Sequence, residues 1–386
     1  MFSWQTKMSM IKAVLTKKSP FYVQFFVSNK CHLHCRMCNI VKANESLAPL
    51  GKEKIEAIAG NLRAIGCGVI LLTGGEPFMR QDIAEIVKSF KTYGLDLRLQ
   101  TAGLSSRFDL MRACAEAGAG DINVSVDSLD EELSDYINGV PGSWKQTIRT
   151  IAWICREFPA KSTVCAIGCV LSPLNLRHVE SVLDFATQIG WWLSLVPVHI
   201  SRRNNFNFRG FNEEFIFEPA RYGEIDLLVN RLKEKKKKGA LIFDSYDFLE
   251  SIKSFVRGGN PTWRVNGVCD SPELYFAINP DGSFAPCCDH NLEEKVYVYD
   301  VDFPERYKSG ELSGKVRRIT ERCPGCNFGS YPEMTLSVRS PRVFIERLFL
   351  QVRSAYIHHR PVEDDALFAR ISEMKKKYAE SYEIVS

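Results

Sequence analysis

The sequence lacks any apolar run of about 18 residues, the length that a membrane-spanning helix requires. Residues 1–20 are basic and lack the long apolar core of a secretory signal. The sequence also lacks a large excess of either charge, because 50 Lys and Arg residues are nearly balanced by 46 Asp and Glu residues, which leaves a net charge of +4. These absences predict a cytoplasmic protein, and so small and dispersed a charge argues against nucleic acid as a partner.

Cysteine is abundant, with 13 residues in a chain of 386. Without a secretory signal, this number indicates a reducing compartment and metal binding instead of disulfides. The 45% apolar content is enough for one large and one small domain. Five cysteines lie among apolar residues and are interpreted as buried small hydrophobes. These five are Cys67, Cys114, Cys155, Cys165 and Cys169.

A first group of cysteines, Cys31, Cys35 and Cys38, has the spacing C-x3-C-x2-C. The group follows residues 21–27, an aromatic and β-branched run that predicts a strand. Three thiolates in one loop can hold three irons of a [4Fe-4S] cube and leave the fourth iron open to a small molecule. A zinc site is the alternative, with His32 or His34 as the fourth ligand.

Apolar runs alternate with helix-length segments along the first half of the chain. This alternation predicts parallel βα units with right-handed crossovers. Six units make a partial (β/α)6 TIM-like barrel of the α/β class, whereas a closed barrel takes about eight. The expected strands are residues 21–27, 67–72, 96–101, 122–128, 162–171 and 193–199.

The cysteine loop resembles that of the radical S-adenosylmethionine (SAM) superfamily, C-x3-C-x-φ-C. The resemblance places Met37 at the φ position, where it is expected to pack on the adenine of SAM. Gly74-Gly75-Glu76-Pro77 is similar to the GGE motif of that family. A carboxylate or carbonyl there can accept hydrogen bonds from the SAM ammonium group. An ordinary turn is the alternative for this segment.

Two further segments are similar to family motifs. Thr101-Ala102-Gly103 matches a T-N-G motif except for Ala102, which removes one side-chain contact. Ser125 and Asp127 end the fourth expected strand and are implied to lie near the SAM ribose or carboxylate, unless they cap a helix beginning near Leu129. The cofactor-binding residues that the resemblance implies are Met37, Gly74, Gly75, Glu76, Pro77, Thr101, Ser125 and Asp127.

A second group of cysteines surrounds a predicted hairpin. Residues 274–278 and 283–285 flank Asn-Pro-Asp-Gly, a strong turn signal. This layout resembles the twitch domain, a short relative of the SPASM domain, whose four thiolates would close a second, auxiliary [4Fe-4S] cluster. Zinc remains an alternative, and Cys288 is an alternative to Cys287. The metal ligands implied for the two sites are Cys31, Cys35, Cys38, Cys269, Cys287, Cys323 and Cys326.

The assignments divide the chain into five segments. We expect a small C-terminal cysteine-rich α+β domain of the twitch or SPASM type after the barrel. The segments are an N-terminal extension (1–20), the radical SAM partial barrel (21–225), a helical connector (226–262), the auxiliary cluster domain (263–335) and a C-terminal helical segment (336–386).

The resemblance implies an enzyme that cleaves SAM reductively to a 5′-deoxyadenosyl radical, which takes a hydrogen atom from a substrate carbon. The electron would come from a reducing partner such as flavodoxin or ferredoxin. Oxidation of a small-molecule biosynthetic intermediate is favoured, although epimerisation, addition and bond formation stay open. The polar and aromatic segment 201–209 is a candidate substrate contact, with a plain surface connection as the alternative.

Three alternatives for function remain. One is a SPASM-type peptide maturase, although such maturases often carry a leader-binding domain and only 20 residues precede the first expected strand. Another is a lipid- or isoprenoid-modifying enzyme, suggested by the apolar and basic helix expected at residues 342–360. For that helix, docking on the protein is favoured over contact with a membrane. The last is a metal-stabilised binding scaffold that is not an enzyme.

Overall fold

The computed structural model describes residues 3–161, 163–201 and 207–383. Within these residues, eight strands form one sheet in the order β6-β5-β4-β3-β2-β1-β7-β8. Neighbouring strands run parallel except β7 and β8, which are antiparallel. The strands are β1 (Tyr22–Ser28), β2 (Val69–Gly74), β3 (Asp96–Thr101), β4 (Asp121–Ser125), β5 (Val164–Leu171), β6 (Trp192–Pro197), β7 (Tyr275–Ile278) and β8 (Phe284–Ala285).

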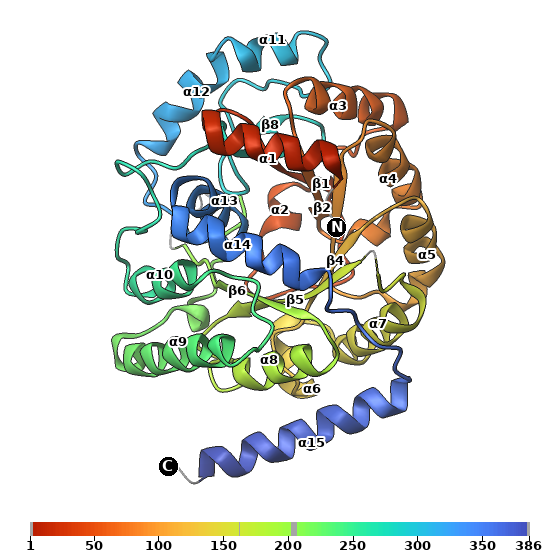
Figure 1. Ribbon diagram of the computed structural model, residues 1–386, viewed down its shortest axis with the longest axis vertical. Coiled ribbons are helices and arrows are strands. Elements are labelled where there is room, and N and C mark those ends of the chain that lie inside the picture. The colour runs from red at the N-terminus through yellow and green to blue at the C-terminus, as the bar shows by residue number, and fades with distance from the viewer. Residues whose placement is uncertain (1–2, 162, 202–206, 384–386) are drawn as a thin grey trace.

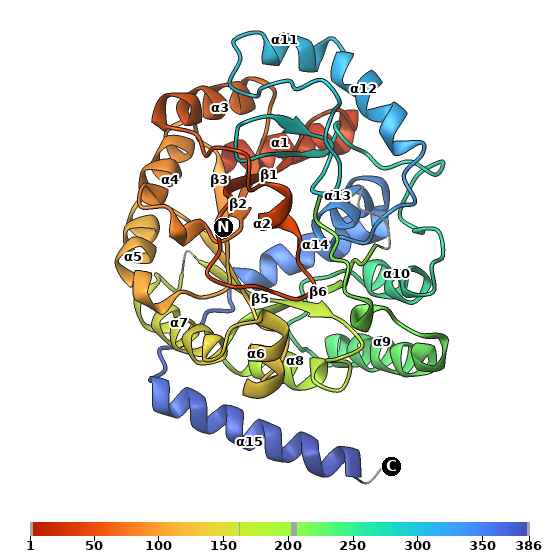
Figure 2. The ribbon, with the colours of Figure 1, turned by 180° about the vertical axis from the view of Figure 1, so that it is seen from behind.

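Helices surround the curved sheet, as Figure 1 and the reverse view in Figure 2 show. Each pair of consecutive strands from β1 to β6 is joined through at least one helix, as parallel pairing requires. The helices are α1 (Trp4–Thr16), α2 (Ile40–Ala43), α3 (Lys52–Ala64), α4 (Ile83–Thr92), α5 (Phe108–Glu116), α6 (Glu131–Asn138), α7 (Ser143–Glu157), α8 (Val179–Gln188), α9 (Tyr222–Lys237), α10 (Tyr246–Val256), α11 (Phe303–Lys308), α12 (Glu311–Thr320), α13 (Ser330–Arg339), α14 (Pro341–Ser354) and α15 (Asp364–Glu383), with short 3-10 turns η1 (Pro77–Met79), η2 (Ser105–Arg107), η3 (Glu213–Phe215) and η4 (Pro219–Arg221).

The six-strand α/β architecture predicted from the sequence is confirmed. Each expected strand is present, with ends displaced by a few residues. Burial alternates along β3 and β5, because one side of each strand packs under helices and the other faces the barrel interior. On β3, Leu97 and Leu99 are buried in the hydrophobic core, whereas Arg98 and Gln100 are only half-buried.

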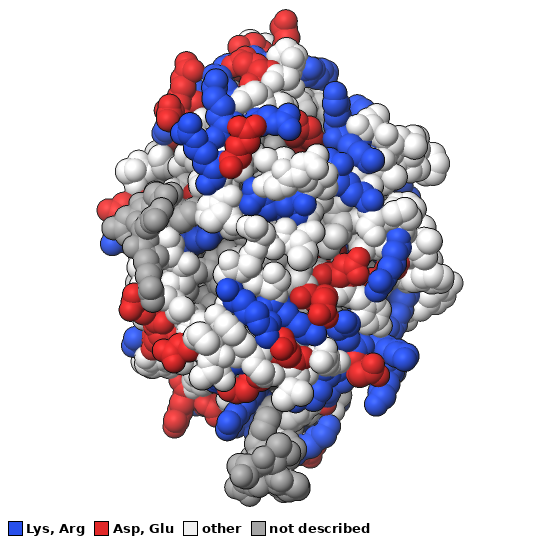
Figure 3. All heavy atoms as spheres, turned by 90° about the vertical axis from the view of Figure 1, so that its left-hand side faces the viewer, with Lys and Arg blue, Asp and Glu red and all other residues white. Residues whose placement is uncertain are grey.

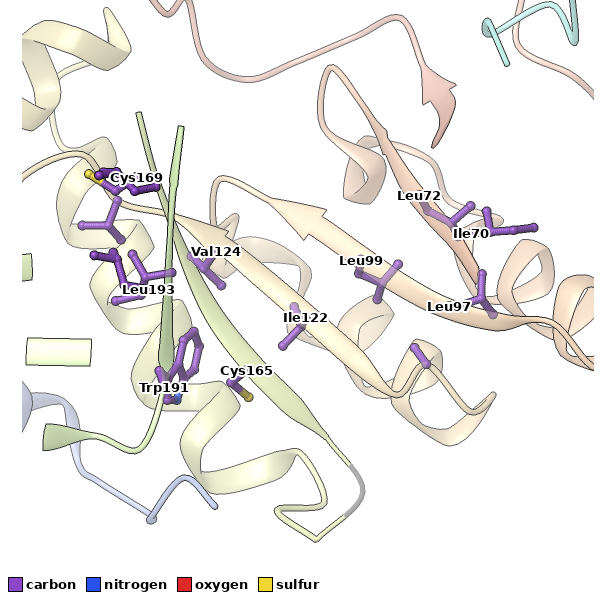
Figure 4. Packing of buried hydrophobic residues seen from close by; sticks show 14 of the residues in the cluster. Ile70, Leu72, Leu97, Leu99, Ile122, Val124, Cys165, Cys169, Trp191 and Leu193 are labelled. Atoms are coloured by element: carbon purple, nitrogen blue, oxygen red, sulfur yellow. The ribbon is translucent and has the colours of Figure 1, made fainter. Parts of the chain in front are cut away.

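The hydrophobic core lies between the strands and the surrounding helices. Figure 4 shows apolar side chains of β2 to β6 gathered in this layer, with Cys165 and Cys169 of β5 among them. The five cysteines expected to be buried hydrophobes are all buried, so that prediction is confirmed. These thiols fill space like other small apolar groups and take no part in the two cysteine groups described below.

The predicted hairpin of the cysteine-rich segment extends the barrel sheet. β7 pairs in parallel with β1, from Tyr22 opposite Tyr275 to Phe25 opposite Ile278. β8 returns beside β7 and ends the sheet. The second cysteine group is therefore connected to the barrel through backbone hydrogen bonds, while the domain boundaries near residues 225, 263 and 335 stay predictions.

Helix α13 occupies the open side of the partial barrel, between β1 and β6. The Ser330 hydroxyl donates to the Tyr22 hydroxyl at 3.0 Å, and the Tyr331 hydroxyl donates to Gln24 Oε1 at 2.7 Å, so the helix is attached to β1. On the other side, a Cβ at Gly329 would lie 3.0 Å from Val196 Cγ2 of β6. A cavity of about 120 Å³ remains between α13, α1, α14 and the inner strand residues.

Helix α14 belongs to the segment that was expected to dock on the protein. It does dock, through Val343, Arg347 and Leu350, yet it leaves a second apolar face exposed. Nearby, Lys235 and Lys236 of α9 form ion pairs with Asp184 and Glu346. Among the described residues, no helix has both the length and the apolar content to cross a membrane.

Candidate functional site

The first cysteine group lies in the loop that follows β1, at the carboxyl end of the parallel strands. Two backbone hydrogen bonds fix this loop to the end of α6, from His34 N to Asn138 O at 3.0 Å and from Arg36 N to Ile137 O at 2.9 Å. The Arg36 guanidinium also lies 4.0 Å from the centre of the Tyr136 ring. Loop conformation is therefore set by a neighbouring βα unit as well as by its own sequence.

Cys31, Cys35 and Cys38 are electrostatic neighbours. Burial raises the pKa of the Cys31 thiol to about 12. Burial also raises the pKa of Cys35, and the nearby Cys38 and Cys31 raise it further. Iron binds thiolates, so the favourable energy of iron ligation has to offset this cost of deprotonation.

Gly74 and Gly75 permit direct contact between the loop after β2 and the cysteine loop. The Gly75 N–H donates to Ser28 O at 2.9 Å, and the Glu76 N–H donates to Lys30 O at 2.7 Å. A Cβ on Gly75 would lie 2.1 Å from Lys30 O, which no side chain can do. The two glycines are required for this close backbone approach, whatever ligand the loops hold.

Glu76 is fully buried, and its carboxylate is already surrounded by donors. It accepts hydrogen bonds from the Thr101 hydroxyl at 2.9 Å, from Ala102 N–H at 2.9 Å and from Phe78 N–H at 3.1 Å. Burial raises the pKa of Glu76 to about 7, against the effect of these donors. The carboxylate holds the ends of β2 and β3 together, which leaves backbone carbonyls of the loop as the acceptors for a ligand.

Ser125 and Asp127 do not cap α6, so the helix-capping alternative is wrong. That helix begins at Glu131, and its N-cap is Asp130, which accepts from Leu133 N–H at 3.0 Å. Asp127 instead accepts from Val170 N–H at 2.7 Å, and burial raises its pKa to about 7. Asp127 is also close enough to Cys35 to raise the pKa of that thiol.

The remaining residues expected to bind the cofactor lie on the same edge of the sheet. Ser125 accepts a hydrogen bond from Gln100 Nε2 at 3.3 Å. Met37 is half-buried, and its carbonyl lies against Gly210, where a Cβ would approach it to 2.4 Å. Pro77 is buried at the start of η1. The motifs separated by about a hundred residues in sequence therefore converge at the ends of β1 to β4.

The second cysteine group converges beside the β7–β8 hairpin. Burial raises the pKa of Cys287, and neighbouring Asp289, Cys326 and Cys269 raise it further. Burial raises the pKa of Cys269, and the nearby Cys323 raises it further. Two backbone carbonyls of this group accept hydrogen bonds from side chains. Trp263 Nε1 donates to Cys326 O at 2.9 Å, and an Arg264 nitrogen donates to Cys323 O at 3.0 Å.

Cys288 differs from Cys287 in its surroundings. Its side chain is buried in a cluster of apolar residues, and its N–H donates to the Tyr331 hydroxyl at 3.1 Å. Cys287 is only partly buried, at the margin of the same cluster. The structure therefore favours Cys287 over Cys288 as the ligand of a group held between the four cysteines.

Arg209 connects the two cysteine groups, and sequence reasoning did not single it out from its loop. Its backbone pairs with that of Cys38, its side chain donates to Asp289 Oδ2 at 2.7 Å, and a second nitrogen donates to Gly325 O at 2.8 Å. Gly325 lies between Cys323 and Cys326. The position of Asp289, directly after two cysteines, was the one sequence signal for this link.

The candidate substrate segment 201–209 is only partly described, because residues 202–206 lie outside the described residues. The end of the segment packs on the cysteine-rich region. Asn207 N donates to Asp289 O at 3.1 Å, and the Phe208 ring meets that of Phe328 edge to face. Arg209 is buried and engaged by Asp289.

Comparisons with known proteins agree with this geometry. Residues 25–186 match the radical SAM superfamily. A probable GTP 3′,8-cyclase of Pyrococcus abyssi is 28% identical over 188 residues, which cover 48% of this chain and 60% of that protein. A PqqA peptide cyclase of Rhodopseudomonas palustris is 25% identical over 324 residues, 80% of either chain.

A solved structure has the same fold. Streptococcus suis SuiB, in its complex with S-adenosylmethionine, superimposes with a TM-score of 0.60 over 81% of this chain and 71% of SuiB, at 14% identity. This chain spans about three fifths of the length of the Pyrococcus cyclase. The fold, the matched segment and the converging motifs show that the chain carries a domain of the radical SAM superfamily, whose cofactors are SAM and a [4Fe-4S] cluster.

The residues present fit those cofactors. The first site offers three thiols and no carboxylate within its own loop, a donor set suited to iron–sulfur ligation with one iron left open. The second site offers four thiols, which would close a cluster. Among the described residues, no three or more His, Cys, Asp or Glu side chains are gathered around a position for a single metal ion.

Proposed function

We propose that this protein is a radical SAM enzyme with one auxiliary cluster, acting on a small-molecule biosynthetic intermediate. The observation that carries the proposal is the convergence of three unpaired thiols with the Gly74–Gly75 loop at the carboxyl ends of the strands. When bound there, SAM and a reduced cluster supply a 5′-deoxyadenosyl radical that takes hydrogen from an unactivated carbon. The protein contributes binding, orientation and exclusion of water.

Different residues of the site would bind the cluster and SAM. Cys31, Cys35 and Cys38 would ligate three irons, and the backbone carbonyls of the Gly74–Gly75 loop would accept from the SAM ammonium group. Glu76 acts through its bonds to Thr101 and Ala102, which set the position of that loop.

Further contacts to SAM would come from the neighbouring strands. Met37 would pack on the adenine, while Ser125 and Asp127 would lie toward the ribose or the carboxylate. These contacts are suited to holding SAM in one orientation at the carboxyl ends of the strands.

The second cysteine group serves the proposed reaction as an electron relay. Cys269, Cys287, Cys323 and Cys326 would leave no iron open, so direct ligation of substrate is disfavoured. Arg209 joins this group to the Cys38 backbone, which holds the two sites in a fixed relation. An oxidation is the reaction class that uses such a relay, with reduced flavodoxin or ferredoxin supplying the first electron in the reducing cytoplasm.

A peptide substrate is the second candidate. The observation that favours it is the match to a PqqA peptide cyclase, which spans 80% of both chains and so extends beyond the barrel segment. A peptide would enter at the carboxyl ends of the strands, next to the segment ending at Phe208.

Cleavage of SAM by the anaerobically reconstituted and reduced protein tests the proposal. We expect 5′-deoxyadenosine to form, and we expect about eight irons per chain if both clusters are present. Cys35→Ala should abolish cleavage, because it removes an iron ligand, whereas Cys155→Ala, a buried cysteine outside both groups, should retain it. Iron-loaded wild-type protein that forms no 5′-deoxyadenosine would favour the metal-stabilised scaffold instead.

A further inference from the structure

Helix α1 exposes its large apolar side chains and buries its small ones. Trp4, Met8, Ile11 and Leu15 follow one another at the spacing of a single helical stripe, and between 45% and 77% of each is exposed. The opposite face, with Thr6, Ser9 and Ala13, is buried. A helix that packed by hydrophobicity alone would have the reverse orientation.

Polar contacts hold α1 in this orientation. The Ser3 N–H donates to Asp96 Oδ2 at 2.7 Å, and the Thr6 hydroxyl donates to Gly68 O at 3.0 Å. Ser3 is also the N-cap of the helix and accepts from Thr6 N–H at 3.2 Å. These bonds attach α1 to the amino ends of β2 and β3, so its apolar stripe faces outward as part of the folded state.

Helix α14 also exposes an apolar stripe, in addition to the inner face that buries Val343 and Leu350. Ile345, Leu348, Phe349 and Val352 form an outward stripe, with 46% to 71% of each side chain exposed. Its inner face carries Arg347, which donates to Phe243 O and forms an ion pair with Glu333 inside the protein. The polar group is buried and the apolar stripe is exposed, as in α1.

The two stripes lie on one face of the molecule. Figure 1 shows α1 and α14 together on the side nearest the viewer, and both pack against α13 and line the same cavity. We call this surface the α1/α14 face and define it by the eight apolar residues of the two stripes. An exposed apolar surface of this kind on two fixed helices marks an interaction site.

Basic residues border the α1/α14 face. The exposed charged residues of residues 3–20 and 341–354 are all basic. The acidic residue in these segments, Glu346, is directed inward and bonds Lys236. Figure 3, which looks at the adjoining side, shows positive and negative side chains interspersed there. The basic residues of the face are Lys7, Lys12, Lys17, Lys18, Arg342 and Arg353.

The geometry points to docking of the α1/α14 face on an anionic lipid bilayer. Apolar stripes of two helices enter the boundary between head groups and acyl chains, and the bordering lysines and arginines contact the phosphates. A second copy of this chain is a poorer occupant, because pairing the same face with itself brings two sets of positive charges together. This inference does not depend on the proposed SAM chemistry, since it concerns the opposite end of the barrel.

Trp4 provides a direct test in the full-length protein. It is 74% exposed, whereas the other five tryptophans are at most 6% exposed. We expect its emission to shift to shorter wavelength when vesicles of phosphatidylcholine and phosphatidylglycerol are added, and brominated lipid to quench it. Trp4→Phe should lose both responses. Vesicles of phosphatidylcholine alone, or salt raised from about 0.1 M to about 0.5 M, should weaken them.

Acidic substitutions within the stripes test which residues enter the bilayer. The double variant Leu15→Glu/Phe349→Glu should partition onto the mixed vesicles roughly tenfold or more weakly than the wild type in a flotation assay. Leu227→Glu is a control for an added negative charge at an exposed apolar position, because Leu227 is 59% exposed but belongs to α9. Circular dichroism checks that both variants are folded, which the exposure of the substituted residues favours.

Three results would overturn the inference. One is wild-type protein that shows no binding to the mixed vesicles at low salt. Another is binding that the double variant and Leu227→Glu weaken equally, which would assign the contact to another face. The third is a dimer, seen by sedimentation velocity, that the double variant dissociates while vesicle binding is absent, because the face would then be occupied by a second copy.

Discussion

Arg209 and Asp289 form a buried ion pair between the two cysteine groups, with Arg209 Nε 2.7 Å from Asp289 Oδ2. Both residues are less than a tenth exposed. Asp289 also accepts from Phe208 N–H at 3.3 Å, so it bonds both the side chain of Arg209 and the backbone of the preceding residue. Arg209 also pairs with Cys38 through its backbone and donates to Gly325 O through its side chain. One residue therefore contacts both the loop that bears Cys38 and the loop that bears Cys323 and Cys326.

Arg209→Met should destabilise the protein by about 3 kcal/mol, because it leaves the Asp289 carboxylate buried without a counter-charge. Urea unfolding of the iron-free protein measures this loss. Arg257→Met is the matched control, since Arg257 pairs with Asp226 at 2.7 Å near the surface and should cost less than about 1 kcal/mol. Equal losses in the two variants would contradict a special role for the buried pair.

Thr101→Val tests how Glu76 holds the glycine loop. The substitution removes a hydroxyl that donates to the buried carboxylate at 2.9 Å, and we expect a loss of stability of about 1–3 kcal/mol. SAM binding, measured by isothermal titration with iron-loaded protein, should weaken as well. Thr101→Ser keeps the hydroxyl and should restore both properties. If Thr101→Val binds SAM as tightly as the wild type, the loop does not depend on this bond.

The choice between Cys287 and Cys288 can be measured as iron content. Cys287→Ala should lose about four irons per chain after anaerobic reconstitution, because the second cluster then lacks one ligand. Cys288→Ala should keep about eight, since that thiol packs among apolar side chains. The opposite pattern would show that Cys288 is the ligand and that the hairpin shifts when iron binds.

The sequence was sufficient for the six strands of the barrel and for the motifs at their carboxyl ends. Strand patterns and glycine-bearing loops depend on neighbouring residues, so six βα units and the ends of β1 to β4 follow from local signals. The turn at 279–282 also predicted the β7–β8 hairpin correctly. The pairing of β7 with β1 had no such signal, because it joins segments about 250 residues apart.

The orientation of helices was not predictable in the same way. Periodicity shows that α1 and α14 each have an apolar stripe, and the usual expectation is that the stripe is buried. In the structure, buried polar groups decide the orientation instead. Thr6 bonds Gly68 O and Arg347 pairs with Glu333, and both partners are distant in sequence. The same distance explains why the link from Arg209 to Asp289 was missed.

Asp244 gives the fold a predictable dependence on pH, away from both cysteine groups. Asp244 belongs to the connection from α9 to α10, and its buried carboxylate accepts from Leu195 N–H of β6 at 2.6 Å and from the Ser194 hydroxyl at 3.3 Å. Burial raises its pKa to about 7, and the nearby Glu333 adds to the effect. The folded protein therefore holds a proton on this group that the unfolded chain releases at lower pH.

A carboxyl group whose pKa is raised by folding stabilises the folded state below its unfolded pKa, and this contribution is lost as pH rises through the folded pKa. For Asp244 the loss runs from about pH 4 to about pH 7 and amounts to about 4 kcal/mol. Asp244→Asn keeps both hydrogen bonds, because its amide oxygen accepts from Leu195 N–H and its NH2 group donates to the Ser194 oxygen. Urea unfolding at about pH 5 and about pH 8 should therefore show the variant gaining stability relative to the wild type as pH rises. A difference that stays constant with pH would mean that Asp244 is ionised in the folded protein.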